Sequence, residues 1–408
     1  MKSVSKETEL SYYGWVIVIM AFFGNLFAYG LAFAYGIFLK EIAAEFGWSR
    51  ASIVSAFSIY AFTHNLFSPF AGWLTDKFGP RLTTAFGGLC LGASMILMGF
   101  VKDIWELYFY YTLVFGLGVA SMYGPMMATV SHWFTQRRGM AIGLAVSGVG
   151  GGSLVFSPLV ALIISLYGWR TSYMVIGTAT LIMFIPITIF IRAPSRETVG
   201  IEGKHEGALS FSFMEALKTK ALWIFSLSWL FIAMALWAIM IHMVPLLTDK
   251  GISLKMAGLL AGLIGAGSIL GRIIAGIISD KLGRRQTILL TYHFQLIMLI
   301  WLLFSEGVWM FFIFALLFGV SSGGWGSALA AIPADYFGLR AIGAIFGLVI
   351  IIVGIGVGIG PYIGGYIFDK THSYYYMVLI CIFVTIVAIV LTLFLKSPAA
   401  AQCDASFN

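Results

Sequence analysis

Long, continuous apolar runs are the feature that most constrains this chain. A run of about 20 apolar residues is long enough for a helix to cross the hydrocarbon core of a bilayer. Because the runs do not alternate with polar residues, they disfavour a membrane barrel. They predict an all-α membrane protein with twelve transmembrane helices. The spans are expected at about 13–39, 52–75, 82–101, 105–132, 139–165, 169–191, 221–248, 256–279, 286–305, 309–334, 341–368 and 374–395.

Composition supports the bilayer as solvent. Of the 408 residues, 60% are hydrophobic and only 10% are charged, whereas a soluble domain carries about 25% charged residues. The net charge of +7 does not indicate a nucleic-acid partner, because the basic residues are scattered over short loops. The three cysteines suggest neither a disulfide framework nor a metal site, and no cofactor is expected. The first run is too long for a cleavable signal peptide.

The basic residues predict a topology. Most of the 24 Lys and Arg residues fall at the N-terminus, in the loops after even-numbered spans and in the tail. By the positive-inside rule, both termini are then cytoplasmic, in a multi-pass protein of the inner (plasma) membrane. We expect an N-terminal six-helix bundle (1–191), a cytoplasmic linker (192–220) with a short surface helix near 213–217, and a C-terminal six-helix bundle with the tail (221–408). A monomer in the lipid bilayer is expected.

An internal repeat relates the two halves. Gly72-Trp-Leu-Thr-Asp-Lys-Phe-Gly-Pro-Arg81 recurs as Gly276-Ile-Ile-Ser-Asp-Lys-Leu-Gly-Arg-Arg285, at an offset of 204 residues. A second repeated pattern, which runs from Phe115 to Phe134 and from Phe318 to Phe337, has an offset of 203. Because six spans separate the copies, the repeats have the same orientation. Two parallel six-helix pseudo-repeats are a recurring transporter plan.

This repeated loop between spans 2–3 and 8–9 resembles the signature of the major facilitator superfamily. Its aspartates can accept charge-assisted hydrogen bonds near helix ends. We therefore expect a conformational latch, although loop charge that only sets topology is the alternative. The expected latch residues are Gly72, Asp76, Arg81, Gly276, Asp280 and Arg284.

Two further stretches resemble the monocarboxylate transporter family and its bacterial relatives, including oxalate/formate-type carriers. They are the segment from Trp133 to Gly148 and the tetrapeptide Tyr13-Gly-Trp-Val16. The resemblance implies secondary active transport of a small monocarboxylate such as lactate or pyruvate, with a proton as co-substrate. An organic-anion exchanger, or a carrier of another small organic acid, is the alternative. A membrane enzyme is not expected, because no buried catalytic set is visible.

Arg272 lies near the middle of the span at 256–279. An arginine at that depth costs about 2.5–3.5 kcal/mol on insertion scales. None of the 17 acidic residues is expected deep in a span, so the sequence predicts that a substrate carboxylate binds Arg272. Backbone carbonyls or water around Arg272 are the alternative. One central cation favours a monoanion over a dicarboxylate.

The helix face that carries Arg272 is otherwise built of small residues. These residues either leave room for a ligand or allow close helix packing. They are Gly258, Gly262, Gly265, Ser268 and Gly276. The family resemblance also implies a key arginine in this span, preceded one turn earlier by an acid; that place holds Ser268 here. The span-1 lysine of mammalian members corresponds to Phe33, which implies an apolar or aromatic first-half wall.

Other candidates are polar or aromatic residues within the spans. His242 is expected to bind substrate and, with Arg272, to be a proton-coupling candidate; a histidine bonded between helices is the alternative. Tyr123 is a possible hydrogen-bond donor beside a helix break at Gly124-Pro125, or a packing residue. His64 and His293 are expected to be packing residues. The weaker wall candidates are Phe33, Leu144, Asn25, Tyr29, Trp325 and Tyr362.

Overall fold

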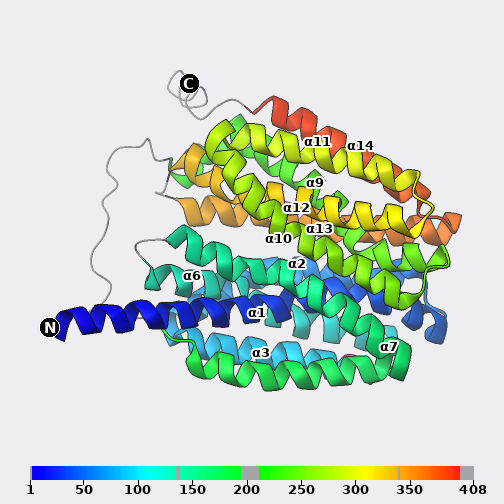
Figure 1. The fold of residues 1–408 in the computed structure, drawn as a ribbon, viewed down its shortest axis with the longest axis horizontal. Helices are drawn as coiled ribbons and strands as arrows, with labels where there is room; N and C mark the ends of the chain where they lie inside the picture. The colour runs from blue at the N-terminus through cyan, green and yellow to red at the C-terminus, as the bar shows by residue number, and fades with distance from the viewer. Residues whose placement is uncertain (1, 135–137, 194–210, 339–340, 396–408) are drawn as a thin grey trace. The chain divides into compact units, whose positions relative to one another are not determined.

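The computed structural model describes residues 2–134, 138–193, 211–338 and 341–395, and within these ranges the chain is helical without strands (Figure 1). The Trp133–Gly148 motif and the expected linker therefore lie partly outside the described residues. The elements are α1 (Lys2–Phe46), α2 (Arg50–Phe78), α3 (Pro80–Met98), α4 (Ile104–Tyr108), the π-helix η1 (Phe109–Phe115), α5 (Gly116–Ala120), α6 (Tyr123–Trp133), α7 (Arg138–Phe190), α8 (Phe213–Leu217), α9 (Lys220–Asp249), α10 (Leu254–Leu282), α11 (Arg284–Leu303), α12 (Val308–Phe337), α13 (Ile342–Thr371) and α14 (Tyr375–Leu393).

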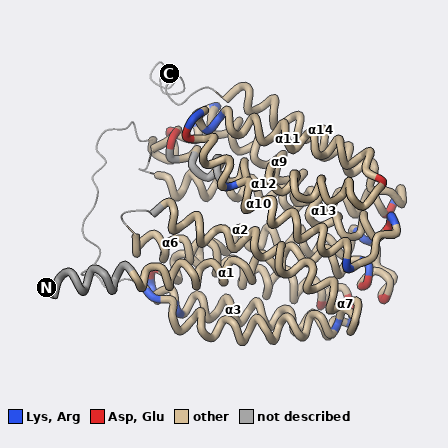
Figure 2. The backbone as a smooth tube through the Cα atoms, viewed as in Figure 1, with Lys and Arg blue, Asp and Glu red and all other residues tan. Residues whose placement is uncertain are grey.

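Every predicted span corresponds to helical chain. Within the described ranges, ten segments are long and apolar enough to cross a membrane. One of them, Gly139–Phe190, holds two predicted spans, because Gly168 (φ 80°, ψ 167°) interrupts the helical backbone of α7. The more polar helix α2 covers the remaining predicted span. Figure 2 shows the charged residues gathered toward helix ends, with the middles of the helices almost free of them.

The fourth span is broken into short helices. Asp103 caps α4, accepting hydrogen bonds from the backbone N–H groups of Trp105 and Glu106. The π-helix η1 follows, and the helical path is interrupted between α5 and α6 at Ser121 and Met122. The break lies just before the predicted Gly124-Pro125, because Pro125 fits in the first turn of α6, where its missing N–H costs no hydrogen bond.

The repeat is visible in the backbone. Helices α2 and α10 each have 29 residues, and their ends are offset by the same 204 residues as the sequence motif. Each is followed by a glycine with the same backbone angles: Gly79 has φ 85° and ψ 162°, and Gly283 has φ 84° and ψ 161°. Residues with a side chain rarely adopt this conformation. The tight turn into the next helix therefore requires glycine in both copies.

The described contacts divide the chain into two units. Unit 1 comprises 1–46, 59–202 and 254–262; unit 2 comprises 47–58, 203–253 and 263–408. This division differs from the sequence-based one at two short segments. Residues 47–58, which begin α2, belong to unit 2, and residues 254–262, which begin α10, belong to unit 1.

In unit 1, helices α1 and α7 approach backbone to backbone. A Cβ added at Gly30 would lie 2.9 Å from the Cα of Gly152, and one added at Gly148 would overlap the carbonyl oxygen of Phe22. The glycine run at 148–152 therefore packs helices closely. Small residues at such contacts are the usual means of packing membrane helices.

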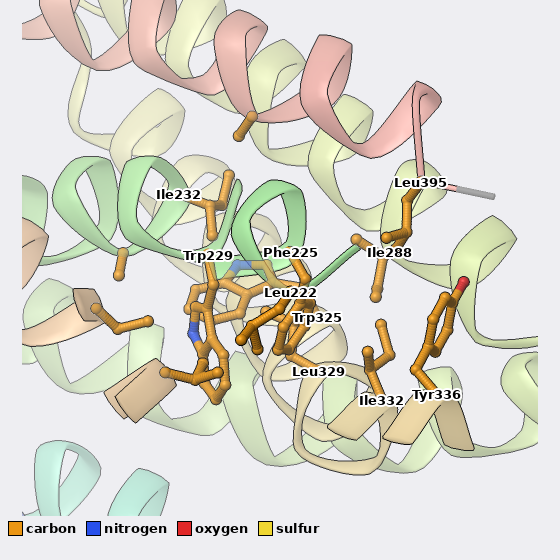
Figure 3. Packing of buried hydrophobic residues seen from close by; sticks show 14 of the residues in the cluster. Leu222, Phe225, Trp229, Ile232, Ile288, Trp325, Leu329, Ile332, Tyr336 and Leu395 are labelled. Atoms are coloured by element: carbon orange, nitrogen blue, oxygen red, sulfur yellow. The ribbon is translucent and has the colours of Figure 1, made fainter. Parts of the chain in front are cut away.

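Unit 2 has a hydrophobic core between α9, α11, α12, α13 and α14 (Figure 3). Trp325 is buried there, and its indole N–H donates to the Gln295 Oε1 atom at 2.9 Å. Trp325 is thus a core residue. The expected surface helix after the linker is present as α8, with a capping box in which Ser212 and Glu215 satisfy each other's backbone N–H groups.

Candidate functional site

Arg272 lies on α10, which packs tightly against α12 in unit 2. A Cβ added at Gly271 would overlap the carbonyl oxygen of Val320, and one added at Gly323 would overlap that of Ser268. The backbones of α10 and α12 are therefore in direct contact beside Arg272. The arginine itself is partly buried. This packing fixes the backbone position from which the Arg272 side chain extends.

The small residues on one face of α10 have different surroundings along the helix. Gly258 and Gly262 pack on α7 in unit 1, where added Cβ atoms would lie 2.8 Å from the Ser157 oxygen and 3.2 Å from the Leu154 oxygen. These two glycines therefore serve close helix packing. Gly276, in contrast, faces open space. Ser268, one turn before Arg272, is partly buried.

Tyr29 joins the expected wall residues of unit 1. Its ring lies 6.5 Å from that of Phe33 and 5.9 Å from that of Tyr123, between α1 and the start of α6. All three rings are partly buried. Leu144 lies on α7 with 44% of its surface exposed. From the sequence, Tyr29 is only a weaker candidate, although it is the residue that brings Phe33 and Tyr123 together.

His242 is fully buried in unit 2. Its Nε2 atom lies 2.8 Å from the Pro361 carbonyl oxygen, and its Nδ1 atom lies 3.1 Å from the Tyr374 hydroxyl. Because a carbonyl can only accept, the neutral ring carries its proton on Nε2, and the Tyr374 hydroxyl donates to Nδ1. This is the geometry of a histidine bonded between helices, and its role toward substrate or proton stays a prediction.

Tyr374 connects His242 to a group of charged residues, here called the Arg50 cluster: Arg50, Asp249, Asp369 and Tyr374. The Arg50 guanidinium donates to both oxygens of Asp249, at 2.7 and 3.1 Å, and to the Tyr374 hydroxyl at 2.7 Å. The backbone N–H groups of Arg50 and Ala51 donate to the two oxygens of Asp369, at 2.9 and 2.8 Å.

Sequence reasoning missed this cluster, because its members lie up to 324 residues apart at the ends of different helices. No spacing in the sequence indicates it. Among the described residues, no group of three or more His, Cys, Asp or Glu side chains is placed to hold a metal ion.

The repeated loops place one arginine of each copy on a helix end. Arg81 donates to the carbonyl oxygens of Ile191 (3.1 Å) and Ile189 (2.7 Å), at the end of α7. Arg285 donates to those of Thr392 (3.3 Å) and Leu393 (2.7 Å), at the end of α14. Orphan carbonyls at a helix C-terminus are thereby satisfied.

By these contacts, Arg285 is the counterpart of Arg81. The latch role expected for Arg284 stays a prediction. Arg284 forms an ion pair with Asp335. The 204-residue offset was the signal that could have identified Arg285. Of the other expected latch residues, Asp76 and Asp280 are exposed, and Gly72 and Gly276 face open space.

The two family-like stretches meet at the same end of α7. The Tyr13 hydroxyl donates to the Phe190 carbonyl oxygen at 2.6 Å, and the Trp133 indole donates to that of Arg192 at 2.8 Å. A Cβ added at Gly14 would lie 3.0 Å from the ring of Phe134. The motif residues thus cap one helix end and pack there on each other.

Comparisons with known proteins agree with this architecture. The sequence model of the Major Facilitator Superfamily matches residues 21–304 and 230–406. The uncharacterized MFS-type transporter YcxA of Bacillus subtilis is 27% identical, over 90% of this chain and 91% of its own length. The oxalate:formate antiporter of Oxalobacter formigenes is 27% identical, over 70% and 68%. Human monocarboxylate transporter 11 is 24% identical, over 89% and 78%.

A solved structure shares the fold. It is a bacterial homolog of the human lysosomal transporter Spinster, with a TM-score of 0.71 and 15% identity over 97% of both chains. Together with the helical spans and the duplicated loops, these matches identify a multi-pass membrane transporter of small molecules, not an enzyme. The chain belongs to the Major Facilitator Superfamily.

Proposed function

We propose that this transporter carries a small monocarboxylate, such as lactate or pyruvate, together with a proton, by alternating access. It acts as a monomer in the inner (plasma) membrane, with both termini cytoplasmic. The observation that carries the proposal is Arg272, a partly buried arginine in the central part of α10. The named relatives, which include a monocarboxylate transporter and an oxalate:formate antiporter, support it.

The physical argument concerns the charge of Arg272. A cation in the hydrocarbon region is costly, and a guanidinium matches a carboxylate through two parallel hydrogen bonds. A bound monoanion would neutralise the charge and lower the cost of closing the site. The loaded carrier would then change conformation more readily than the empty one. A single arginine favours one carboxylate over two.

The other predicted residues divide between the two units. Ser268 lies one turn from Arg272, and His242 remains a proton-coupling candidate together with Arg272. Phe33, Tyr123 and Leu144 would form the apolar and aromatic wall. The repeated loops, with Gly72, Asp76, Arg81, Gly276, Asp280 and Arg284, would act as the latch. Arg81 and Arg285 bind the ends of α7 and α14.

A test compares wild type with Arg272→Lys and Arg272→Ala in proteoliposomes. We expect labelled lactate uptake under an inward proton gradient to be abolished by the alanine variant. The lysine variant should retain only part of the uptake. Lysine keeps the positive charge but lacks the planar guanidinium that donates two parallel hydrogen bonds to a carboxylate. Lys102→Ala, at an exposed position, is the matched control. Undiminished uptake by Arg272→Ala would refute the assignment.

Exchange of organic anions is the second candidate, favoured by the antiporter among the relatives. Counterflow without a pH gradient distinguishes the two modes. An exchanger would require a loaded anion inside the vesicles, and a collapsed proton gradient would leave its rate unchanged. A symporter would accumulate substrate only while the proton gradient lasts.

A further inference from the structure

A chain of hydrogen bonds leads from the buried ring of His242 to the charged start of α2. The Tyr374 hydroxyl lies 3.1 Å from the Nδ1 atom of His242 and accepts from the Arg50 guanidinium at 2.7 Å. Arg50 in turn donates to both oxygens of Asp249, whose side chain is 26% exposed. All four residues belong to unit 2. A titratable ring that is itself 0% exposed is thus connected to the surface of this unit.

Two adjacent glycines of α13 join the same two parts of unit 2 by packing. A Cβ added at Gly365 would lie 3.0 Å from the backbone N and Cα atoms of Ala51, in the first turn of α2. A Cβ added at Gly364 would lie 2.6 Å from the Cδ2 atom of the His242 ring. The first turn of α2 and the imidazole therefore contact one short segment of α13. The hydrogen-bond chain and this packing connect them by separate routes.

The protonation state of His242 decides which of these hydrogen bonds can form. The neutral ring donates from Nε2 to the Pro361 carbonyl and accepts at Nδ1 from Tyr374, whose oxygen keeps a lone pair for Arg50. A proton taken from water by Nδ1 makes both ring nitrogens donors. The Tyr374 oxygen would then accept from two cations at once, and like charges at such a distance repel each other. Protonation of His242 therefore weakens the bond between Tyr374 and Arg50.

The charged and titratable groups around His242 determine the sign of this effect. Arg50 faces the ring from α2, Asp369 from α13 and Tyr374 from the N-terminal end of α14. Asp249, on the same helix as His242, binds the Arg50 side chain, and Asp369 binds the first backbone N–H groups of α2. Among the described residues, the bonded partners of the ring are a hydroxyl and a carbonyl group. A positive charge on the ring is therefore not compensated by a bonded carboxylate.

We propose that His242 binds the transported proton, that Tyr374 is its positioning residue, and that protonation releases the start of α2 from the rest of unit 2. This rests on the proposed function, in which a proton accompanies the acid. While His242 is neutral, Tyr374 orients toward both the ring and Arg50, and the contact is formed. Once the contact is released, the ring is open to water and carries its proton. Proton binding is thereby linked to a conformational change through one hydroxyl group.

The test is amide hydrogen exchange of residues 47–58 in the purified full-length protein without substrate, corrected for the intrinsic effect of pH on exchange. A histidine with an ordinary pKa of about 6.5 that is protonated only in the released form favours release about tenfold between about pH 7.5 and about pH 5.5. We therefore expect wild type to lose protection about tenfold on acidification. His242→Gln should lose less than about twofold, because its amide keeps a donor and an acceptor but does not titrate.

Tyr374→Phe separates a positioning role from a merely structural one. Without the donating hydroxyl, the ring can be protonated while the contact is still formed, so the loss on acidification should fall to about threefold or less. A structural role alone would lower protection equally at both pH values. Tyr376→Phe, at an exposed position of the same helix, is the matched control and should keep the full loss of wild type.

Protection that does not change with pH in wild type would overturn the inference. The full loss in His242→Gln would also overturn it, because the titrating group would then be Asp249 or Asp369. The full loss in Tyr374→Phe would overturn the role of Tyr374. If the glutamine variant does not fold, His242→Asn is measured in its place by the same criterion. A pH-dependent contact in a protein that takes up no monocarboxylate would overturn the proposed function alone, and uptake without a pH-dependent contact would overturn only this inference.

Discussion

The first turns of α2 and α10 occupy related places in the repeat, yet they are held by different chemistry. In unit 2, residues 47–58 are held by the Arg50 cluster and by a hydrogen bond from Ser58 to the Gly358 carbonyl oxygen, at 2.6 Å. The guanidinium of Arg50 also lies 3.5 Å over the ring of Phe368. This contact depends on directional charged hydrogen bonds.

In unit 1, residues 254–262 are held mainly by close packing against the backbone of α7. Gly258 and Gly262 lie against the backbone of α7, and the Ser153 hydroxyl donates to the Ala261 carbonyl oxygen at 3.2 Å. The comparison shows that a duplicated backbone can keep its helix bounds while the side chains that hold it diverge. One contact is vulnerable to lost charge, the other to added volume.

The largest expected effect is that of Gly258→Leu. The new side chain would overlap the Cβ of Ala161 and lie close to the Ser157 carbonyl oxygen. Overpacking of this kind costs typically about 1–3 kcal/mol, and more where backbone must move. We expect faster amide exchange across residues 254–262 and a lower midpoint of thermal unfolding. Gly143→Leu, on open space in α7, is the control; equal stability of the two variants would contradict the packing account.

Asp369→Ala tests the charged contact. It removes the acceptor of the first two N–H groups of α2. Loss of such a cap costs about 0.5–2 kcal/mol. Amide exchange at Arg50 and Ala51 should accelerate while residues 254–262 are unaffected. Asp369→Asn keeps one acceptor oxygen, so it should lie between alanine and wild type. A uniform change in both segments would mean that the two contacts are not independent.

Arg50→Lys should have a smaller effect, about 1 kcal/mol. Lysine keeps the charge but cannot donate in parallel to both oxygens of Asp249 or stack its head group on Phe368. The free energy of unfolding of the purified protein measures the loss. Lys370→Arg, at a neighbouring exposed position, is the control. A lysine variant as stable as wild type would show that charge alone suffices.

The smallest effects are expected at the repeat-related helix caps. Arg81→Ala and Arg285→Ala should each destabilise by about 0.3–1 kcal/mol, through lost interactions with the carbonyl groups of α7 and α14. The two losses should be similar, because each arginine donates two hydrogen bonds to carbonyl groups at one helix end. Arg284→Ala serves as the comparison at the neighbouring residue. A loss confined to one of the two copies would show that the caps have diverged as the helix starts have.

The sequence predicted the helices well and the helix-end contacts poorly. Hydropathy reports which segments can lie in lipid, so the spans could be predicted. The repeat could be predicted from the recurring loop motif, and the short helix α8 was also expected from the sequence. The Arg50 cluster could not, since it joins residues far apart along the chain. The different partners of the adjacent arginines Arg284 and Arg285 likewise depend on tertiary contacts that no sequence pattern indicates.

Within the candidate site, the types of residue were easier to predict from the sequence than the contacts between their side chains. Arg272 is visible from its charge alone, and an aromatic wall was expected from Phe33. The central place of Tyr29 was not, because the sequence contains eighteen tyrosines and only packing distinguishes them. The bonds that His242 makes to Tyr374 and Pro361 likewise depend on tertiary structure.

The membership of residues 47–58 in unit 2 has a consequence for synthesis. Arg50 is made 199 residues before Asp249 and 319 residues before Asp369. At about 5–20 residues per second, its partners follow only after roughly 10–60 seconds. Throughout that interval, the start of α2 has to remain in place without them. Because translation is sequential, the Arg50 cluster at the start of α2 is complete only after the last helices have been made.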